Sequence, residues 1–172
     1  MKREVINNMK PKSIVLIGMM ASLLFVVQVS LSFIPNVELV SLLIILYTKL
    51  FHKKTIFIIY VFVLLEGLMY GFGIWWFGYL YVWIILYIII TKLNHASLYT
   101  YAIVSSAFGL SFGALFSIPY FLIGRFSFGI SFWISGIPFD ITHSISNFIL
   151  ILILYKPLFF VLDKLNKQYE LI

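Results

Sequence analysis

The chain has 172 residues, of which 63% are hydrophobic, 19% aromatic and only 10% charged. This composition is typical of an integral membrane protein and excludes a soluble domain built around its own core. The absence of cysteine excludes disulfides, thiolate metal sites and cysteine nucleophiles. The net charge of +6 is spread over the ends of apolar segments, which argues against a nucleic-acid-binding face.

Six apolar segments predict one all-α transmembrane domain over residues 1–172, a bundle of six helices. At about 20 residues per span, a chain of this length holds no further soluble domain. The basic stretch Met1–Lys12 precedes a long apolar run, as in a signal peptide, but no cleavage site follows, which predicts a retained helix. The predicted spans are residues 13–34, 37–51, 54–72, 75–91, 99–123 and 131–155.

Glycine and proline mark the ends of these spans. Pro35 ends the first span, and a glycine-bounded stretch over residues 124–129 separates the last two. Pro138 is predicted in the first turn of a helix, where its missing N–H costs nothing. The tail over residues 156–172 mixes Leu and Phe with Lys and Asp, which predicts a short amphipathic segment on the membrane surface.

The basic residues predict the orientation of the chain. Arg125 alone falls in a loop on the other side of the membrane. The rest of the 12 lysines and arginines fall at the termini or in the loops after the second and fourth spans: Lys2, Arg3, Lys10, Lys12, Lys49, Lys53, Lys54, Lys92, Lys156, Lys164 and Lys167. The positive-inside rule therefore places the chain in the plasma membrane with both termini in the cytoplasm.

Acidic groups gather in the outer half of the predicted bundle. Glu38, Glu66 and Asp140 lie near the outer ends of three spans, on the same side as Arg125 and His143. Such groups are costly in a bilayer and usually face a bundle interior or a wet cavity. Convergence from four segments favours a ligand cavity, because a contact that only joins two helices needs only two segments.

The last span carries a polar face. Asp140, His143, Ser144 and Asn147 are spaced so that one side of a helix presents all four. The functional interpretation is a binding face, and the alternative is a polar cluster that only holds helices together. An intramembrane base formed by His143 and Asp140 is a weaker third reading. No catalytic, phosphate-binding or metal motif occurs, so we expect no enzyme, no cofactor and no metal.

Aromatic residues form a stripe on the fourth span and could stack against a flat ligand. The alternative is an interfacial aromatic belt, which explains the deeper Trp83 poorly. Tyr70 follows Glu66 by one turn and would lie beside this stripe. Its members recur every four residues or adjoin that row: Trp75, Trp76, Tyr79, Tyr81, Trp83 and Tyr87.

Small residues form two further stripes, which allow helix backbones to approach closely. On the fifth span they are predicted to pack inside the bundle: Ser105, Gly109, Gly113 and Ser117. On the first span, Gly18 and Ser22, with Ala21 beside them, either pack inside or form a docking face for another membrane subunit.

Together these features resemble a known family. The six short spans, the cytoplasmic termini, the small-residue motif on the first span and the pattern Gly136-x-Pro138-x-Asp140-x-x-His143-x-x-x-Asn147 resemble the substrate-binding S components of energy-coupling factor (ECF) vitamin transporters. The family pattern on the first helix is Ala-x-x-x-Ala, and here Gly18 and Ser22 take those places.

The resemblance implies high-affinity capture of a vitamin or related micronutrient. The implied partners are a transmembrane coupling subunit and two ATPase subunits, which hydrolyse ATP in place of this chain. Gly18, Ala21 and Ser22 would form the docking face. The implied ligand contacts are Glu38, Glu66, Tyr70, Trp75, Trp76, Tyr79, Arg125, Asp140, His143 and Asn147.

Three acids against one arginine favour a cationic or neutral ligand over a di-acid. Corrinoids, thiamine-like pyrimidines, deazapurine bases and riboflavin all stay open. Two other classes also fit the sequence: a membrane scaffold of the rod-shape type, and a small-molecule transporter that needs no ATPase.

Overall fold

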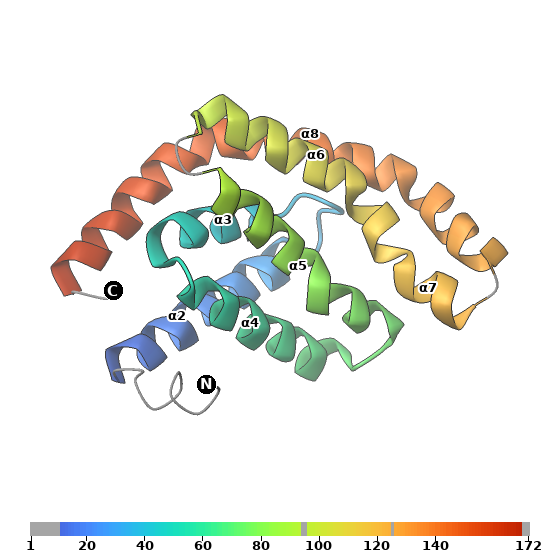
Figure 1. Cartoon of the computed structure of the whole chain (residues 1–172), viewed down its shortest axis with the longest axis horizontal. Coiled ribbons are helices and arrows are strands. Elements are labelled where there is room, and N and C mark those ends of the chain that lie inside the picture. Colours follow the sequence, from blue (N-terminus) through green and yellow to red (C-terminus); the bar gives the residue numbers. More distant parts are fainter. Residues whose placement is uncertain (1–10, 94–95, 125, 170–172) are drawn as a thin grey trace.

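The computed structural model describes residues 11–93, 96–124 and 126–169. Arg125, His95 and the charged residues of the first ten positions therefore lie outside the described residues, as does Glu170. The described part is all-helical, as predicted, and contains no strand. Its helices follow one another in the order of Figure 1: α2 Pro11–Leu31, α3 Val40–Phe51, α4 Lys54–Tyr70, α5 Ile74–Lys92, α6 Leu98–Phe116, α7 Ile118–Ile123 and α8 Phe126–Tyr169.

The centre of the bundle is α3, which contacts α2, α4, α5, α6 and α8. Every residue of α3 except Lys49 is buried. A helix that is apolar all round fits such a position, because every face meets another helix. At 12 residues, α3 is about 18 Å long and cannot cross a hydrocarbon core of about 30 Å by itself.

Four helical segments of the described chain are long and apolar enough to cross a membrane: Pro11–Leu31, Ile74–Lys92, Leu98–Ile123 and Phe126–Tyr169. The fifth predicted span is divided into α6 and α7 by Pro119, which lies in the first turn of α7. Pro119 has no N–H to offer the carbonyl of Leu115, four residues earlier. The Tyr81 hydroxyl donates to that carbonyl oxygen at 2.5 Å, so the break in the helix leaves it paired.

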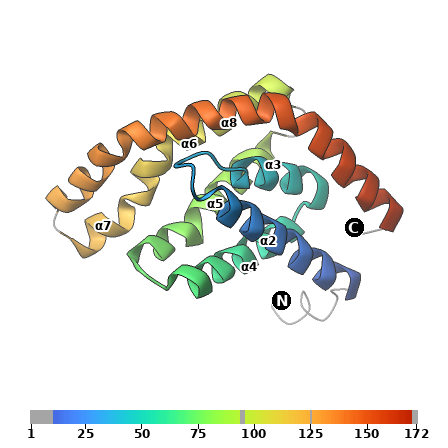
Figure 2. The ribbon, with the colours of Figure 1, turned by 180° about the vertical axis from the view of Figure 1, so that it is seen from behind.

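The last helix differs from the prediction. The boundary expected near residue 155 is absent, because α8 continues for 44 residues through Pro138 and Pro157. Pro138 lies inside α8 and not in its first turn. Figure 2 shows that the helix changes direction between its orange and red parts, where Pro157 falls in the sequence. Proline bends a helix there because it lacks the N–H and crowds the preceding turn.

The two stripes of small residues face in different directions. On α6, Ser105, Gly109, Gly113 and the adjoining Ser117 are buried, as predicted. On α2, Gly18 and Ser22 are exposed, and a Cβ on Gly18 would meet nothing within 4 Å. Ala21 is fully buried, so the expectation that it belongs to a docking face is wrong. Ala21 lies on the buried face of α2 with Ile17 and Leu24, which are four positions before it and three after it.

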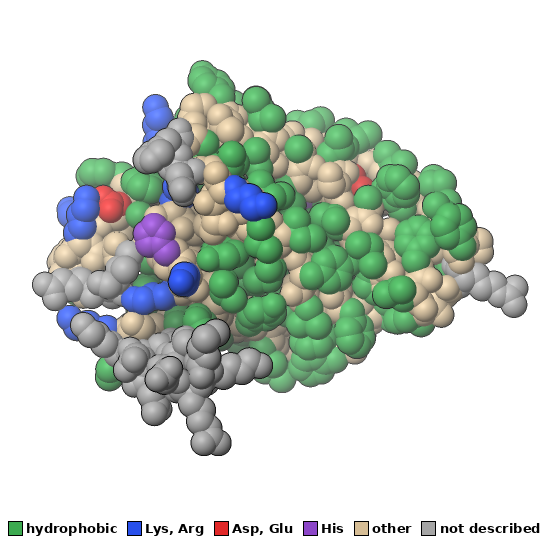
Figure 3. Space-filling model, in the orientation of Figure 1, with side chains coloured by type: hydrophobic (Ala, Val, Ile, Leu, Met, Phe, Trp, Pro, Cys, Tyr) green, Lys and Arg blue, Asp and Glu red, His purple; other side chains and the backbone are tan. Residues whose placement is uncertain are grey.

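Charge is strongly polarised along the molecule. On the face shown in Figure 3, lysine side chains gather at the end where α2 begins and α8 ends. Hydrophobic side chains cover most of the remaining surface in that view. Lysines far apart in the sequence thus share one end, and an apolar surface occupies the remainder, as is typical of a membrane protein.

Candidate functional site

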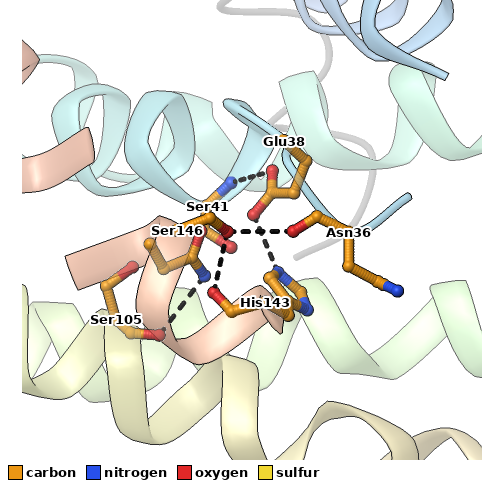
Figure 4. A network of polar contacts seen from close by, with 7 residues as sticks. Asn36, Glu38, Ser41, Ser105, His143 and Ser146 are labelled. Atoms are coloured by element: carbon orange, nitrogen blue, oxygen red, sulfur yellow. Dashed lines mark hydrogen bonds and ion pairs between the residues drawn. The ribbon is translucent and has the colours of Figure 1, made fainter. Parts of the chain in front are cut away.

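A polar network joins the loop between α2 and α3 to the middle of α8 (Figure 4). Glu38 Oε1 lies 3.0 Å from His143 Nε2, and both side chains are buried. Glu38 Oε2 accepts a hydrogen bond of 2.8 Å from the backbone N–H of Ser41, in the first turn of α3. A carboxylate at this position satisfies an N–H that the helix leaves unpaired and complements its dipole. Glu38 therefore fixes the start of α3 and the ring of His143 together.

A second contact fastens the same loop to α8. The Ser146 hydroxyl lies 2.9 Å from the carbonyl oxygen of Asn36 and 3.0 Å from that of His143. Asn36 has a φ of +57°, in the left-handed region that asparagine tolerates better than most residues. The loop between α2 and α3 is thus held on α8 at two points.

Asp140 and Asn147 join α8 to α6. Asp140 Oδ1 accepts a hydrogen bond of 2.9 Å from the N–H of Gly113, and Asn147 Nδ2 donates to the carbonyl oxygen of Ser105 at 3.3 Å. Between them, a Cβ on Gly109 would lie 3.0 Å from backbone atoms of His143. The small residues of α6 thus allow the polar face of α8 to reach the α6 backbone.

We expect Asp140→Ala to lower the free energy of unfolding by about 1–3 kcal/mol, because it removes the acceptor of a buried N–H. Thermal unfolding in detergent measures the loss. Asp163→Ala is the matched control, since Asp163 pairs with Lys167 at the surface of the same helix. Such a surface pair contributes about 0–1 kcal/mol. An equal loss of unfolding free energy in the two variants would contradict the interpretation that Asp140 holds α8 to α6.

The polar network borders a cavity of about 220 Å³. Its walls come from the end of α2, the loop after it, α5, α6 and α8. The lining residues are Gln28, Leu31, Ser32, Ile34, Pro35, Asn36, Val37, Glu38, Tyr79, Trp83, Phe112 and His143.

Aromatic rings form one side of this cavity. Trp83 contacts both Tyr79 and Phe112, with ring centroids 5.6 Å apart in each pair. The ring of Phe112 lies 5.0 Å from that of His143 and is steeply inclined to it. These packed rings give the cavity a rigid apolar wall next to the Glu38–His143 pair.

Two residues that line the cavity each have a buried ring nitrogen without a hydrogen-bond partner: Trp83 Nε1 and His143 Nδ1. Their side chains are only 2% and 3% exposed. Buried polar atoms are nearly always paired, so each such exception needs an explanation. A neutral His143 that donates to Glu38 through Nε2 presents Nδ1 as an acceptor, whereas the indole N–H of Trp83 is a donor. A ligand with both a donor and an acceptor would satisfy the two.

The structure brings together Glu38, Tyr79 and His143 among the predicted site residues. Trp75 packs on the edge of Tyr79, with centroids 5.3 Å apart. The indole N–H of Trp76 donates a hydrogen bond to the carbonyl oxygen of Val63. Trp76 does not line the cavity.

Three other predicted positions lie elsewhere or are not described. Tyr70 is half-exposed at the end of α4. Glu66 is buried within α4, and its Oε1 atom has no partner. Arg125 lies outside the described residues, so its pairing with the acids stays a prediction. In the described part of the chain, no group of three or more acidic or histidine side chains is placed to hold a metal ion.

Sequence reasoning missed Phe112 and Gln28, although Gln28 is a polar residue in an apolar span and Phe112 recurs every four residues with Phe108 and Phe116. Trp83 gave a signal, because it lies deeper in the aromatic stripe than an interfacial belt explains. Asn36 and the loop around it gave no signal in the sequence, since their place in the cavity depends on how the loop folds onto α8.

No protein-family profile matches this chain, and neither the curated proteins nor the solved structures contain a match to it.

Proposed function

We propose that the chain is the substrate-binding S component of an ECF-type importer and captures a small vitamin-like molecule in the 220 Å³ cavity. The observation that carries this proposal is the pair of unpartnered ring nitrogens, on Trp83 and His143, in a cavity walled by aromatic rings. A binding site accounts for such a pair, because its polar groups are paired only when the ligand is present.

The proposed orientation places the lysine-rich end in the cytoplasm, together with both termini, and the chain in the plasma membrane. Lys49 and Lys53 lie at the end of α3, whereas Glu38 precedes its start. The cavity is then separated from the cytoplasmic surface by the length of α3, about 18 Å. It belongs to the outer half of the bundle, from which a capture subunit takes its substrate.

The shape and polarity of the cavity favour a planar heteroaromatic ligand. Its ring would pack against Tyr79, Trp83 and Phe112, and its edge would give a donor to His143 Nδ1 and an acceptor to Trp83 Nε1. Both oxygens of Glu38 already accept hydrogen bonds from the protein, so the ligand need not contact this carboxylate directly. The 220 Å³ volume lies below the ~300–1,000 Å³ of typical ligand pockets. This favours pyrimidine-like or deazapurine-like ligands over corrinoids.

Transport in this proposal requires a transmembrane coupling subunit and two ATPases. The exposed face of α2 at Gly18 and Ser22 is the proposed docking surface, because the small size of these two residues permits close helix approach. The chain then supplies recognition, and its partners supply ATP hydrolysis.

Native mass spectrometry of the gently purified chain tests the proposal. We expect a retained heteroaromatic molecule, or uptake of one from a panel of vitamins and nucleobases, without any ATPase present. Uptake by cells should require the ATPase subunits. A spectrum that stays empty after incubation with the panel would contradict the proposal and favour the scaffold.

Replacing Trp83 by phenylalanine is expected to weaken binding of the retained molecule about 5- to 150-fold. Phenylalanine keeps an aromatic ring but leaves the ligand acceptor without its N–H, which costs about 1–3 kcal/mol. Trp133→Phe makes the same change at an exposed position of α8 and should leave affinity unchanged. Titration calorimetry compares the two variants, and unchanged affinity in both would remove Trp83 from the site.

A further inference from the structure

The 220 Å³ cavity is bordered by two groups of helices. Trp83 of α5, Phe112 of α6 and His143 of α8 line it from one group, and Gln28 and Leu31 line it from α2. α2 packs on α3 and α4, and within the described chain no pair of neighbouring positions joins it to α5, α6 or α8. A ligand in the cavity therefore lies between α2 and the wall that carries the two unpartnered ring nitrogens.

Gln28 is the polar side chain that α2 contributes to this cavity. It is the one carboxamide in the helix, lies three positions before its last residue, and is half-buried. No described residue forms a hydrogen bond with this carboxamide. Burial of an amide without a hydrogen bond costs free energy. The cavity therefore has a third polar group for a ligand to pair, on the side of α2.

The carboxamide of Gln28 offers two adjacent groups, an oxygen that accepts and an NH2 that donates. It pairs best with a ligand edge on which a donor and an acceptor lie side by side, as when glutamine binds adenine bidentately. Cyclic amidines and cyclic amides have such an edge, because an exocyclic amine or oxygen adjoins a ring nitrogen. Trp83 Nε1 and His143 Nδ1 also present one donor and one acceptor. The cavity thus suits a flat ring with a donor and an acceptor on each of two edges.

We propose that Gln28 is the specificity-determining residue of the cavity and that the ligand is of the nucleobase class, an amino- or oxo-substituted nitrogen heterocycle. One edge of the ring binds Trp83 and His143, and the edge with the exocyclic group binds Gln28. This role rests on the proposed function, since it requires a heteroaromatic ligand in the cavity. Gln28 then selects among the heteroaromatic ligands that Trp83 and His143 accept alike.

Titration calorimetry of the full chain with adenine and with purine tests this role. Adenine has two such edges, one at its exocyclic amine and one at its imidazole N–H, whereas purine keeps only the second. Both bases therefore suit Trp83 and His143, and only adenine has both partners for Gln28. We expect adenine to bind about 5-fold more tightly, which is the contribution of one neutral hydrogen bond.

The variant Gln28→Met keeps the length of the side chain and removes both hydrogen-bonding groups. It should bind the two bases with equal affinity, whereas a merely structural change would weaken both and preserve their ratio. Gln168→Met is the matched control, because Gln168 is exposed near the end of α8 and does not line this cavity. The control should keep the preference for adenine. Thermal unfolding in detergent shows that each variant is folded.

Equal affinity of the unmodified chain for adenine and purine would overturn the role of Gln28, and this comparison needs no variant. A preference for adenine that survives in Gln28→Met would overturn it as well. Binding of neither base would overturn the nucleobase class. The proposed function fails too only if native mass spectrometry of the same sample shows no ligand from the wider panel, so the two failures are distinguishable.

Discussion

Replacing Gly109 by valine is expected to lower the free energy of unfolding by about 3 kcal/mol, at the upper end of overpacking effects. A Cβ at this position would lie 3.0 Å from the carbonyl carbon and oxygen of His143 and from the N of Ser144. These are backbone atoms of α8, which cannot turn aside as a flexible side chain does. The two helices with the most extensive contact in the molecule would therefore have to separate.

The matched control is Gly136→Val, which places the same residue inside α8 where a Cβ meets nothing within 4 Å. Thermal unfolding of both variants in the same detergent measures the difference. Separation of α6 from α8 should also break the bond between Asp140 and Gly113 and displace His143, so the Gly109 variant should lose ligand binding. Equal destabilisation by the two variants would contradict close packing at Gly109.

Replacing Glu38 by alanine is also expected to cost about 3 kcal/mol of folding free energy. The change leaves His143 with both ring nitrogens unpaired in a buried position and removes the acceptor of the Ser41 N–H. Breaking a buried pair from one side costs more than the pair contributes, because the remaining group stays desolvated. Equilibrium unfolding in detergent measures the loss.

A double-mutant cycle with His143→Ala separates the pair from the rest of the site. We expect the double variant to be little worse than either single variant, since removal of both partners leaves no unpaired ring. Additive losses of unfolding free energy would show that Glu38 and His143 stabilise the protein independently, and not through their contact with each other.

Glu38→Gln provides a finer version of the same test. Glutamine has one acceptor oxygen and an NH2 group, so it keeps both contacts only if its nitrogen donates to His143 Nε2, which moves the ring proton to Nδ1. The free energy of unfolding of this variant should lie between those of the unmodified chain and of Glu38→Ala. A ligand that donates to His143 Nδ1 should bind less tightly to this variant as well, because Nδ1 then carries the proton and no longer accepts.

The sequence by itself determined the class of the molecule and several of its faces. Apolar runs of this length have no stable place in water, and the lysines fall between them. The small residues from Ser105 to Gly113 lie against α8 as predicted, because only small side chains allow backbones to meet. Asp140, His143 and Asn147 share a buried face, since the period of one helix fixes which of its residues lie together.

The partners of those faces were decided only by the tertiary structure. His143 meets Glu38, which is 105 positions away, while Asp140 and Asn147 face the α6 backbone. Helical period gives the direction of a side chain on its own helix. It contains nothing about how two helices are rotated against each other, because that rotation follows from the packing of the whole bundle.

The same limit explains the expectations that were wrong. In a membrane protein, lipid-facing and buried residues are equally apolar, so no polar stripe reveals which side of α2 faces inward. Ala21 was grouped with Gly18 and Ser22 for this reason, and only the packed bundle shows it buried. Pro138 was expected in the first turn of a helix and Pro157 just after the end of one, yet α8 continues through both and packs on α6 and α7. Local chemistry thus fixed the segments and their faces, and long-range packing fixed which faces meet.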